Sequence, residues 1–141
     1  MRGEKMNYSE LMHAAALVRE NAYAPYSGFK VGAALLGKSG KIYVGCNVEN
    51  ASFSATNCAE RTAFFTAVAA GEHDFEAIAI AGGKDGVEMN ECAPCGVCRQ
   101  VMTEFCDKNF RIILGSPEKI SVYTLGEIMP FTFSAKNLFE K

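Results

Sequence analysis

The sequence is poor in several residue types whose abundance defines a class of protein. Its 141 residues include no tryptophan, two histidines and four prolines, and the formal net charge is −2. Lysine and arginine occur singly or in isolated pairs, whereas a polynucleotide-binding protein usually carries a basic stripe. The expected partners are therefore small ligands or other proteins, and no nucleic acid.

Long hydrophobic stretches are also missing. The longest apolar runs, such as VGAALLG at residues 31–37, are far too short to cross a membrane. The amino-terminal stretch MRGEKMNYSEL lacks the apolar core of a signal peptide. These absences predict a cytoplasmic protein with no membrane partner.

What is present indicates one domain. A chain with 49% hydrophobic residues and no internal repeat or linker-like stretch can bury a core of its own. One domain over residues 1–141 is expected, with residues 1–6, which end at a second methionine, as a disordered overhang.

Apolar periodicity and turn residues predict the order of the elements. Helical spacing and capping residues predict helices over residues 7–23, 58–70 and 94–106, with short ones after 124 and near the end. Strand patterns occupy residues 30–37, 41–46, 75–83, 110–115 and 119–124, the first two as a hairpin. This order predicts an α/β fold, a three-layer α/β/α domain with a mixed sheet of about five strands.

Two polar pairs match the capping box, in which the first residue caps a helix and the residue three positions later bonds back to it. They are Asn7 with Glu10 and Thr124 with Glu127. Pro94 suits the first turn of its helix, and Gly71 suits the position just after a helix.

The chain has six cysteines, namely Cys46, Cys58, Cys92, Cys95, Cys98 and Cys106. A disulfide framework is typical of small secreted chains, and neither a secretion signal nor a poor core is present here. Clustered cysteines in a cytosolic protein more often bind metal or act in redox chemistry. Cys46 and Cys106 lie outside the cluster and are interpreted as small buried hydrophobic residues.

Cys95 and Cys98 lie three positions apart, so on a helix both thiols share one face about one turn apart. This spacing suits two ligands of one metal or a dithiol redox pair, and by itself it is also compatible with chance. A thioredoxin-type motif follows an early strand directly, whereas here a ten-residue loop separates the motif from the preceding strand.

Cys58 and Glu60 lie two positions apart and would point about 200° apart in the middle of a helix. They converge only on a site off the helix end, where the dipole and free N–H groups favour a thiolate. Cys95 also stands at a predicted helix start, and three thiolates at two helix ends suit zinc.

Three protein ligands leave the fourth tetrahedral position open, as in catalytic zinc sites. Neither His13 nor His73 belongs to these elements, and Cys92 is the one alternative for a closed four-cysteine site. An adjacent Arg61 can withdraw negative charge from three thiolates, although an arginine there can also be an ordinary surface residue. Glu60 beside zinc predicts a hydrolytic site with a general acid/base.

These motifs resemble those of a known family. CAER at residues 58–61 and PCGVCRQ at residues 94–100 resemble the zinc nucleoside deaminases, whose pattern is His/Cys-x-Glu followed by Pro-Cys-x-x-Cys. AYAPYSGFKVGAALL, GCNVENASF and LGEIMPFTF match the same family in order. The chain is similar to the small, all-cysteine, homotetrameric cytidine deaminases over about residues 8–139.

The resemblance implies zinc-dependent hydrolytic deamination of cytidine and deoxycytidine, with uridine, deoxyuridine and ammonia as products, in pyrimidine salvage. It implies one zinc per subunit, bound by Cys58, Cys95 and Cys98. Glu60 would carry a proton from water to N3 of the base and then to the leaving ammonia. The charge-tuning role of Arg61 follows from the charge of the three thiolates and not from the resemblance.

The same resemblance implies the nucleoside contacts. In the protomer itself they would be made by Phe29, Asn47, Glu49 and Ala59. In a homotetramer with shared active sites, a neighbouring protomer would be reached by Ala51, Phe53 and Phe133. The family often has tyrosine where this chain has Phe53, so a hydroxyl contact would be missing there.

The residues themselves leave alternatives open. Asn47 and Glu49 follow a strand, where sugar contacts and simple turn chemistry are equally expected. Phe131 and Phe133 alternate as core anchors do, and burial is the prediction from their pattern alone. The rival functions are deamination of another aminopyrimidine nucleoside, such as an antibiotic nucleoside, or of a polynucleotide, and a non-enzymatic zinc or redox module.

Overall fold

The structure is a computed structural model that describes residues 7–139 of the chain. The expected overhang at residues 1–6 lies outside the described residues. The helices are α1 (Tyr8–Arg19), α2 (Ala59–Ala69), α3 (Gly96–Phe105), α4 (Leu125–Ile128) and α5 (Ala135–Phe139), with a 3-10 turn at Phe53–Ala55. The strands are β1 (Phe29–Gly37), β2 (Ile42–Cys46), β3 (Phe75–Lys84), β4 (Arg111–Ser116) and β5 (Lys119–Thr124).

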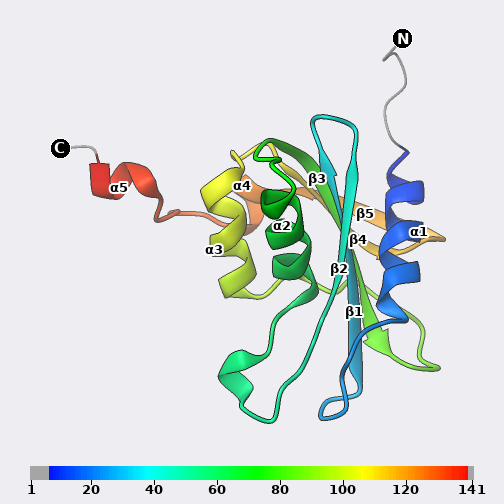
Figure 1. The fold of residues 1–141 in the computed structure, drawn as a ribbon. Coiled ribbons are helices and arrows are strands. Elements are labelled where there is room, and N and C mark those ends of the chain that lie inside the picture. The colour runs from blue at the N-terminus through cyan, green and yellow to red at the C-terminus, as the bar shows by residue number, and fades with distance from the viewer. Residues whose placement is uncertain (1–6, 140–141) are drawn as a thin grey trace.

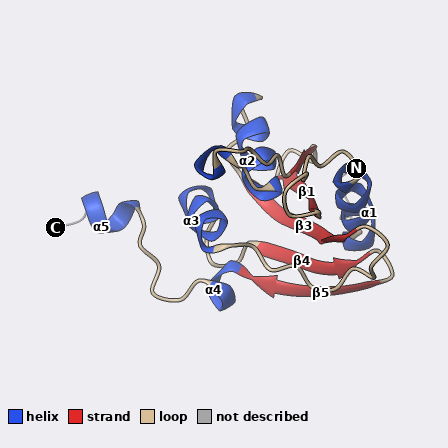
Figure 2. Cartoon of the chain, turned by 90° about the horizontal axis from the view of Figure 1, so that it is seen from below, coloured by secondary structure: helices blue, strands red, loops and turns tan. Residues whose placement is uncertain are grey.

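The five strands form one mixed sheet in the order β2-β1-β3-β4-β5. β1 pairs antiparallel with both β2 and β3, β3 and β4 are parallel, and β4 and β5 are antiparallel. Helix α1 covers one face of the sheet, while α2 and α3 cover the other (Figures 1 and 2). The predicted α/β/α layers and the mixed five-stranded sheet are confirmed.

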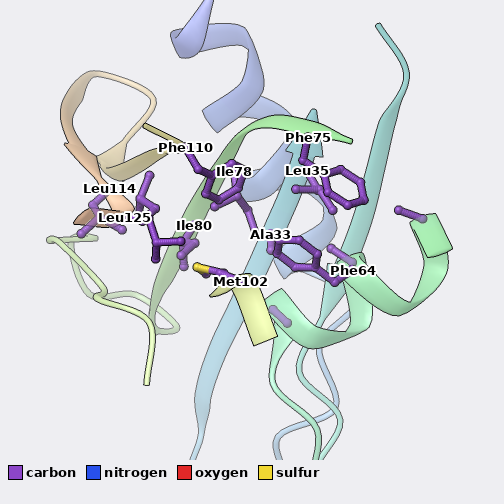
Figure 3. Packing of buried hydrophobic residues seen from close by; sticks show 14 residues of the cluster. Ala33, Leu35, Phe64, Phe75, Ile78, Ile80, Met102, Phe110, Leu114 and Leu125 are labelled. Atoms are coloured by element: carbon purple, nitrogen blue, oxygen red, sulfur yellow. The ribbon is translucent and has the colours of Figure 1, made fainter. Parts of the chain in front are cut away.

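The apolar core is divided by the sheet into two clusters. On the α2 and α3 face, Phe64 and Met102 pack with strand residues such as Leu35, Ile78 and Ile80 (Figure 3). On the α1 face the cluster is made by the alternate strand residues and by Leu11, Met12 and Ala15. Because successive strand side chains point to opposite faces, β1 and β3 supply both clusters at once.

Helix α1 begins where the sequence predicts and ends earlier. Asn7 is its N-cap, but its side chain accepts from the Ser9 N–H at 2.7 Å, so the predicted capping box with Glu10 is wrong. The helix ends at Arg19 instead of residue 23. The chain turns away because the backbone of Tyr23 donates to Asn47 O at 3.0 Å and so joins the loop after β2.

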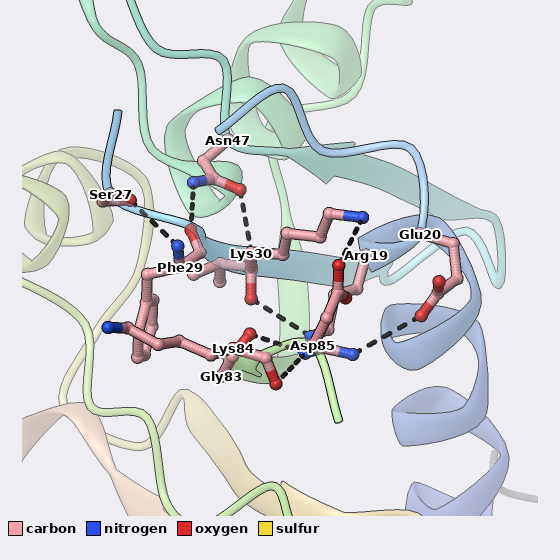
Figure 4. Close-up of polar contacts among 10 residues, drawn as sticks. Arg19, Glu20, Ser27, Phe29, Lys30, Asn47, Gly83, Lys84 and Asp85 are labelled. Atoms are coloured by element: carbon pink, nitrogen blue, oxygen red, sulfur yellow. Dashed lines mark hydrogen bonds and ion pairs between the residues drawn. The ribbon is translucent and has the colours of Figure 1, made fainter. Parts of the chain in front are cut away.

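Arg19, the last residue of α1, ties the helix to the ends of β1 and β3 (Figure 4). Its buried guanidinium donates to the carbonyl oxygens of Lys30 at 3.1 Å, Gly83 at 2.5 Å and Lys84 at 3.2 Å. These carbonyls lie beside Phe29, so the contacts of Arg19 hold the strand ends that border the site described next.

Candidate active site

Two helix N-termini meet at a pair of thiols. Cys58 is the N-cap of α2 and Cys95 is the N-cap of α3, both with extended backbone and neither with a side-chain cap bond. Their sulfur atoms lie 3.8 Å apart although the residues are 37 positions apart in the chain. Pro94 precedes the cap, so its predicted place in the first turn of α3 is wrong by two residues.

Cys98 completes a cluster of three thiols. It lies in the first turn of α3, is buried, and has its sulfur 3.5 Å from that of Cys95. All three sulfurs lie within 4.8 Å of one another. Zinc held tetrahedrally with Zn–S distances of about 2.3 Å has sulfurs about 3.8 Å apart, so this donor set fits zinc.

Arg61 contacts the cluster directly. Its Nη2 donates to Cys58 Sγ at 3.2 Å, and its Nε is buried without a hydrogen-bond partner within residues 7–139. The neighbouring Cys98 thiol and the Arg61 guanidinium lower the pKa of Cys58 to about 5. The hydrogen bond with Cys58, followed by burial, raises the pKa of Cys98. Negative charge is therefore favoured on Cys58, where the guanidinium compensates it.

Glu60 is the second residue of α2 and is only 5% exposed. Burial, followed by the negative charge of Cys58, raises the pKa of Glu60 to about 7. A carboxyl group with this pKa can both accept and release a proton near neutral pH. The arrangement thus places a carboxyl group that can accept and release protons beside a group of thiols that can hold a metal.

Cys92 lies near this cluster without joining it. Its thiol is partly buried against the core, and burial raises its pKa to about 11. The group of thiols that could hold a metal consists of Cys58, Cys95 and Cys98. A Cβ added at Gly82 would lie 2.5 Å from Cys92 Sγ and 3.3 Å from the ring of Phe29. Cys92 therefore packs against β3 and Phe29, and the closed four-cysteine site finds no support.

Asn47 follows β2 and is turned toward β1 (Figure 4). Its Oδ1 accepts from the Val31 N–H at 2.8 Å, and its Nδ2 donates to Phe29 O at 2.9 Å. The amide therefore holds the beginning of β1 in place. Phe29 itself is 39% exposed and lines a cavity together with Cys92.

Glu49 holds the turn that precedes β1. Its carboxylate accepts from the backbone N–H groups of Tyr26 at 2.9 Å and Ser27 at 3.1 Å, and from the Ser27 hydroxyl. The hydrogen bond from the Ser27 hydroxyl, followed by the two backbone bonds, lowers the pKa of Glu49. Glu49 thus stays ionised and fixes the loop beside Phe29.

The remaining residues singled out by the resemblance differ in exposure. Ala59 is fully buried at the start of α2, whereas Ala51 is exposed and Phe53 is 77% exposed. Phe131 is fully exposed and Phe133 is 56% exposed, so the burial predicted from their alternation is wrong. The segment that carries them follows α4 and pairs with no strand within residues 7–139 (Figure 1).

Cys46, Cys92 and Cys106 lie outside the three-thiol cluster. All six cysteines lie within the described residues and none forms a disulfide. Cys46 and Cys106 are partly buried, and burial raises the pKa of both thiols.

Arg99 and Gln100 make long-range contacts that periodicity did not predict, although they directly follow Cys98 in the motif.

Within residues 7–139 no helix is both long and apolar enough to span a bilayer.

Comparison with known proteins identifies the family. Residues 5–114 match the model of the cytidine and deoxycytidylate deaminase zinc-binding region. A curated cytidine deaminase of Sporosarcina psychrophila is 44% identical over 134 residues, which cover 94% of this chain and 96% of the relative. A curated cytidine deaminase of Halalkalibacterium halodurans is 43% identical over 134 residues, covering 94% and 98%.

Solved structures agree with this assignment. The crystal structure of cytidine deaminase from Burkholderia pseudomallei superimposes with a TM-score of 0.82 at 46% identity, covering 91% of this chain and all of that one. The enzyme from Mycobacterium tuberculosis gives a TM-score of 0.76 at 32% identity, covering 92% and 98%. With a three-thiol group that can hold a metal and a matched zinc-binding region, the cofactor is zinc. The chain belongs to the cytidine and deoxycytidylate deaminase family.

Proposed function

We propose that the chain is a hydrolase that deaminates cytidine and deoxycytidine to uridine and deoxyuridine, with release of ammonia, in pyrimidine salvage. The observation that carries the proposal is the buried Glu60 beside three thiols at the N-termini of α2 and α3. Relatives named cytidine deaminase that are 44% and 43% identical over nearly the whole chain support the substrate. On this proposal the whole chain acts as one deaminase domain.

Cys58, Cys95 and Cys98 would hold one zinc ion per chain. Their sulfur separations of 3.8 and 3.5 Å support this role. When bound, zinc supplies Lewis acidity that makes water a nucleophile at neutral pH. Arg61 would limit the negative charge of the thiolates through its contact with Cys58 Sγ at 3.2 Å.

Glu60 would move the protons. A zinc deaminase needs one carboxyl group that is not a metal ligand to serve as general base and then as general acid. Glu60 is buried and its pKa is raised to about 7, which suits both roles. It would take one proton from the attacking water and give it to N3 of the base. It would then take the second proton from the new C4 hydroxyl and give it to the amine, which leaves as ammonia while the C4 carbonyl forms.

The nucleoside would lie beside Phe29, with Asn47, Glu49 and Ala59 around it. Asn47 uses one N–H of its amide for Phe29 O, which leaves a second donor for a ribose hydroxyl. Glu49 is held by the 26–27 turn and accepts hydrogen bonds as an anion, which suits a hydroxyl donor.

Ala51, Phe53 and Phe133 would complete the site of a neighbouring protomer in a homotetramer. All three are exposed, and the segment that bears Phe133 projects from the body (Figure 2). Exposed aromatic residues of this kind are typical of assembly surfaces. A cytoplasmic location belongs to the same proposal, since six unpaired thiols suit a reducing compartment.

The test is production of ammonia and uridine from cytidine by zinc-loaded protein. Glu60→Ala should retain zinc and lose at least about 100-fold in turnover, the usual contribution of a general acid/base. Glu118→Ala, an exposed glutamate in the turn between β4 and β5, is the matched control and should retain full activity.

Three outcomes would contradict this assignment in different ways. Normal turnover by Glu60→Ala would exclude the proton-transfer role. Ammonia release from another aminopyrimidine nucleoside but not from cytidine would change the substrate. No turnover of any nucleoside or polynucleotide by zinc-loaded protein would indicate a non-enzymatic zinc module.

A further inference from the structure

Two side chains that follow Cys98 on α3 contact the carboxyl-terminal part of the chain. The Arg99 guanidinium donates through Nε to Pro94 O at 2.8 Å and through Nη1 to Ile128 O at 2.7 Å. Pro94 is fully buried and directly precedes Cys95. One half-buried arginine therefore links the backbone before a thiol of the cluster to the last residue of α4.

Gln100 makes the next contact along the same helix. Its Nε2 donates to Phe133 O at 2.9 Å. The side chain is exposed, so this bond does not serve the apolar core. Arg99 and Gln100 together hold both ends of residues 128–133, which we call the aromatic turn.

The aromatic turn has a strained backbone. Phe131 has φ of 54°, the one positive φ of a residue other than glycine within residues 7–139. Such a conformation is unfavourable for a bulky residue and persists only where surrounding contacts hold it. Here those contacts are the Thr132 hydroxyl, which donates to Met129 O at 2.6 Å, and the two bonds from α3.

The aromatic turn presents its rings to the outside. Phe131 is fully exposed and Phe133 is 56% exposed, so the protomer itself gains little by burying either side chain. Strain that is maintained by polar contacts at an exposed aromatic pair is typical of a ligand clamp. The turn is therefore shaped for something outside its own protomer.

We propose that Arg99 and Gln100 are positioning residues that hold the aromatic turn in the shape needed to close the nucleoside site of a neighbouring protomer. The inference rests on the proposed function, in which Phe133 reaches that site. Because both residues extend from the first turns of α3, the helix that begins at one metal-binding cluster orders the substrate contact of the next protomer.

Gln100→Glu is the variant that isolates the contact. Glutamate has the same shape but offers only acceptors to Phe133 O, so it removes the bond and adds repulsion. The exposed position of Gln100 makes misfolding a minor concern. Asn109→Asp adds the same charge at an exposed residue whose side chain makes no hydrogen bond within residues 7–139, and it serves as the matched control.

The first measurement is KM and kcat for cytidine, with zinc content and solution mass for each variant. Gln100→Glu is expected to raise KM about tenfold, with zinc per chain and oligomeric mass unchanged, while Asn109→Asp behaves as wild type. An unchanged KM would overturn the proposal. Dissociation of the Gln100→Glu oligomer would also overturn it, since the contact would then serve assembly.

The second measurement separates the two protomers. Mixed oligomers of Gln100→Glu and Glu60→Ala chains contain sites with an intact Glu60 next to a neighbour with an intact aromatic turn. These sites are expected to have the wild-type KM. Part of the measured activity should therefore follow the wild-type KM, and the rest should follow the raised KM. If every active site in the mixture keeps the raised KM, the turn acts within its own protomer and the proposal is wrong.

The proposed function is tested separately, by cytidine turnover of the wild-type protein. Absence of cytidine turnover by the wild-type protein would overturn both the function and this inference. Turnover by the wild type with an unchanged KM in Gln100→Glu would leave the function standing and remove the inference alone.

Discussion

At the scale of single residues, the charge on Cys58 is controlled from two sides. Arg61 donates to its sulfur at 3.2 Å. The free N–H groups of α2 lie at the end of the helix that Cys58 caps. In the proposed site, three thiolates and one zinc ion would carry a net negative charge, which would make zinc a weaker Lewis acid. Both contacts withdraw that charge, and the permanently charged guanidinium is suited to do so.

Replacement of single thiols tests which of them bind zinc. Cys95→Ala is expected to lose most of the roughly one zinc per chain, because only two sulfur ligands remain. Cys92→Ala is the matched control three positions earlier and is expected to keep it, because Cys92 lies outside the cluster. Metal analysis of the purified variants decides, and zinc retained by Cys95→Ala but lost by Cys92→Ala would reverse the assignment.

At the scale of elements, glycines in the strands determine how closely the helices pack. A Cβ added at Gly45 of β2 would lie 2.5 Å from Ala63 N and 2.6 Å from Ala59 O on the backbone of α2. A Cβ at Gly32 of β1 would lie 2.0 Å from Ala15 O on the backbone of α1. Neither backbone can yield locally, so each glycine sets the position of a whole helix, and Gly45 sets that of the helix that begins at Cys58.

Gly45→Ala is therefore expected to move α2 outward and to lower the free energy of unfolding by about 1–3 kcal/mol, the usual cost of overpacking. Urea denaturation at constant zinc measures the change. Gly96→Ala is the control, because a Cβ there meets nothing within 4 Å and alanine stabilises a helix by about 0.4–1 kcal/mol. Equal stabilities of the two variants would contradict the close-packing argument.

The same scale shows how far local signals predict structure. Thr124 and Glu127 form the capping box that their spacing predicts, whereas Asn7 caps α1 without Glu10. The predicted residues 58–70 agree with α2 to within one residue at each end, with Gly71 at φ 96° just beyond. Local propensity did not predict the early end of α1, because Tyr23 pairs with a loop more than twenty residues away.

At the scale of the whole molecule, several large apolar side chains are exposed. Leu17, Phe53, Phe131, Leu138 and Phe139 are each at least 70% exposed. Single exposed apolar residues are ordinary, but several on one chain favour an assembly that covers them. This exposure supports an oligomer. The alternation of Phe131 and Phe133 predicted burial in their own protomer, and that prediction is wrong.

The assembly is expected to contain four chains, with a solution mass about four times the 15.2 kDa of one chain. Sedimentation equilibrium over a range of concentrations measures this mass, with activity recorded in parallel. Since the proposed site is completed by a neighbour, specific activity should fall as the oligomer dissociates on dilution. Full activity at the mass of a single chain would exclude shared sites.

By itself the sequence determined the elements, the three layers and the residue types at the two helix ends. These features depend on periods of two and 3.6 residues and on caps a few positions long, which can be recognised in a linear chain. The family motifs indicated zinc chemistry, because Cys58, Glu60, Cys95 and Cys98 occur at the spacings typical of zinc deaminases.

Only the tertiary structure decided the distances and environments. The 3.8 Å between Cys58 and Cys95, the burial that raises the pKa of Glu60, and the bond from Arg61 depend on how α2 and α3 pack on one face of the sheet. The same packing brings Gln100 to Phe133 across 33 positions. Local sequence patterns cannot specify these contacts, because each joins segments whose separation is set by the close packing of other residues.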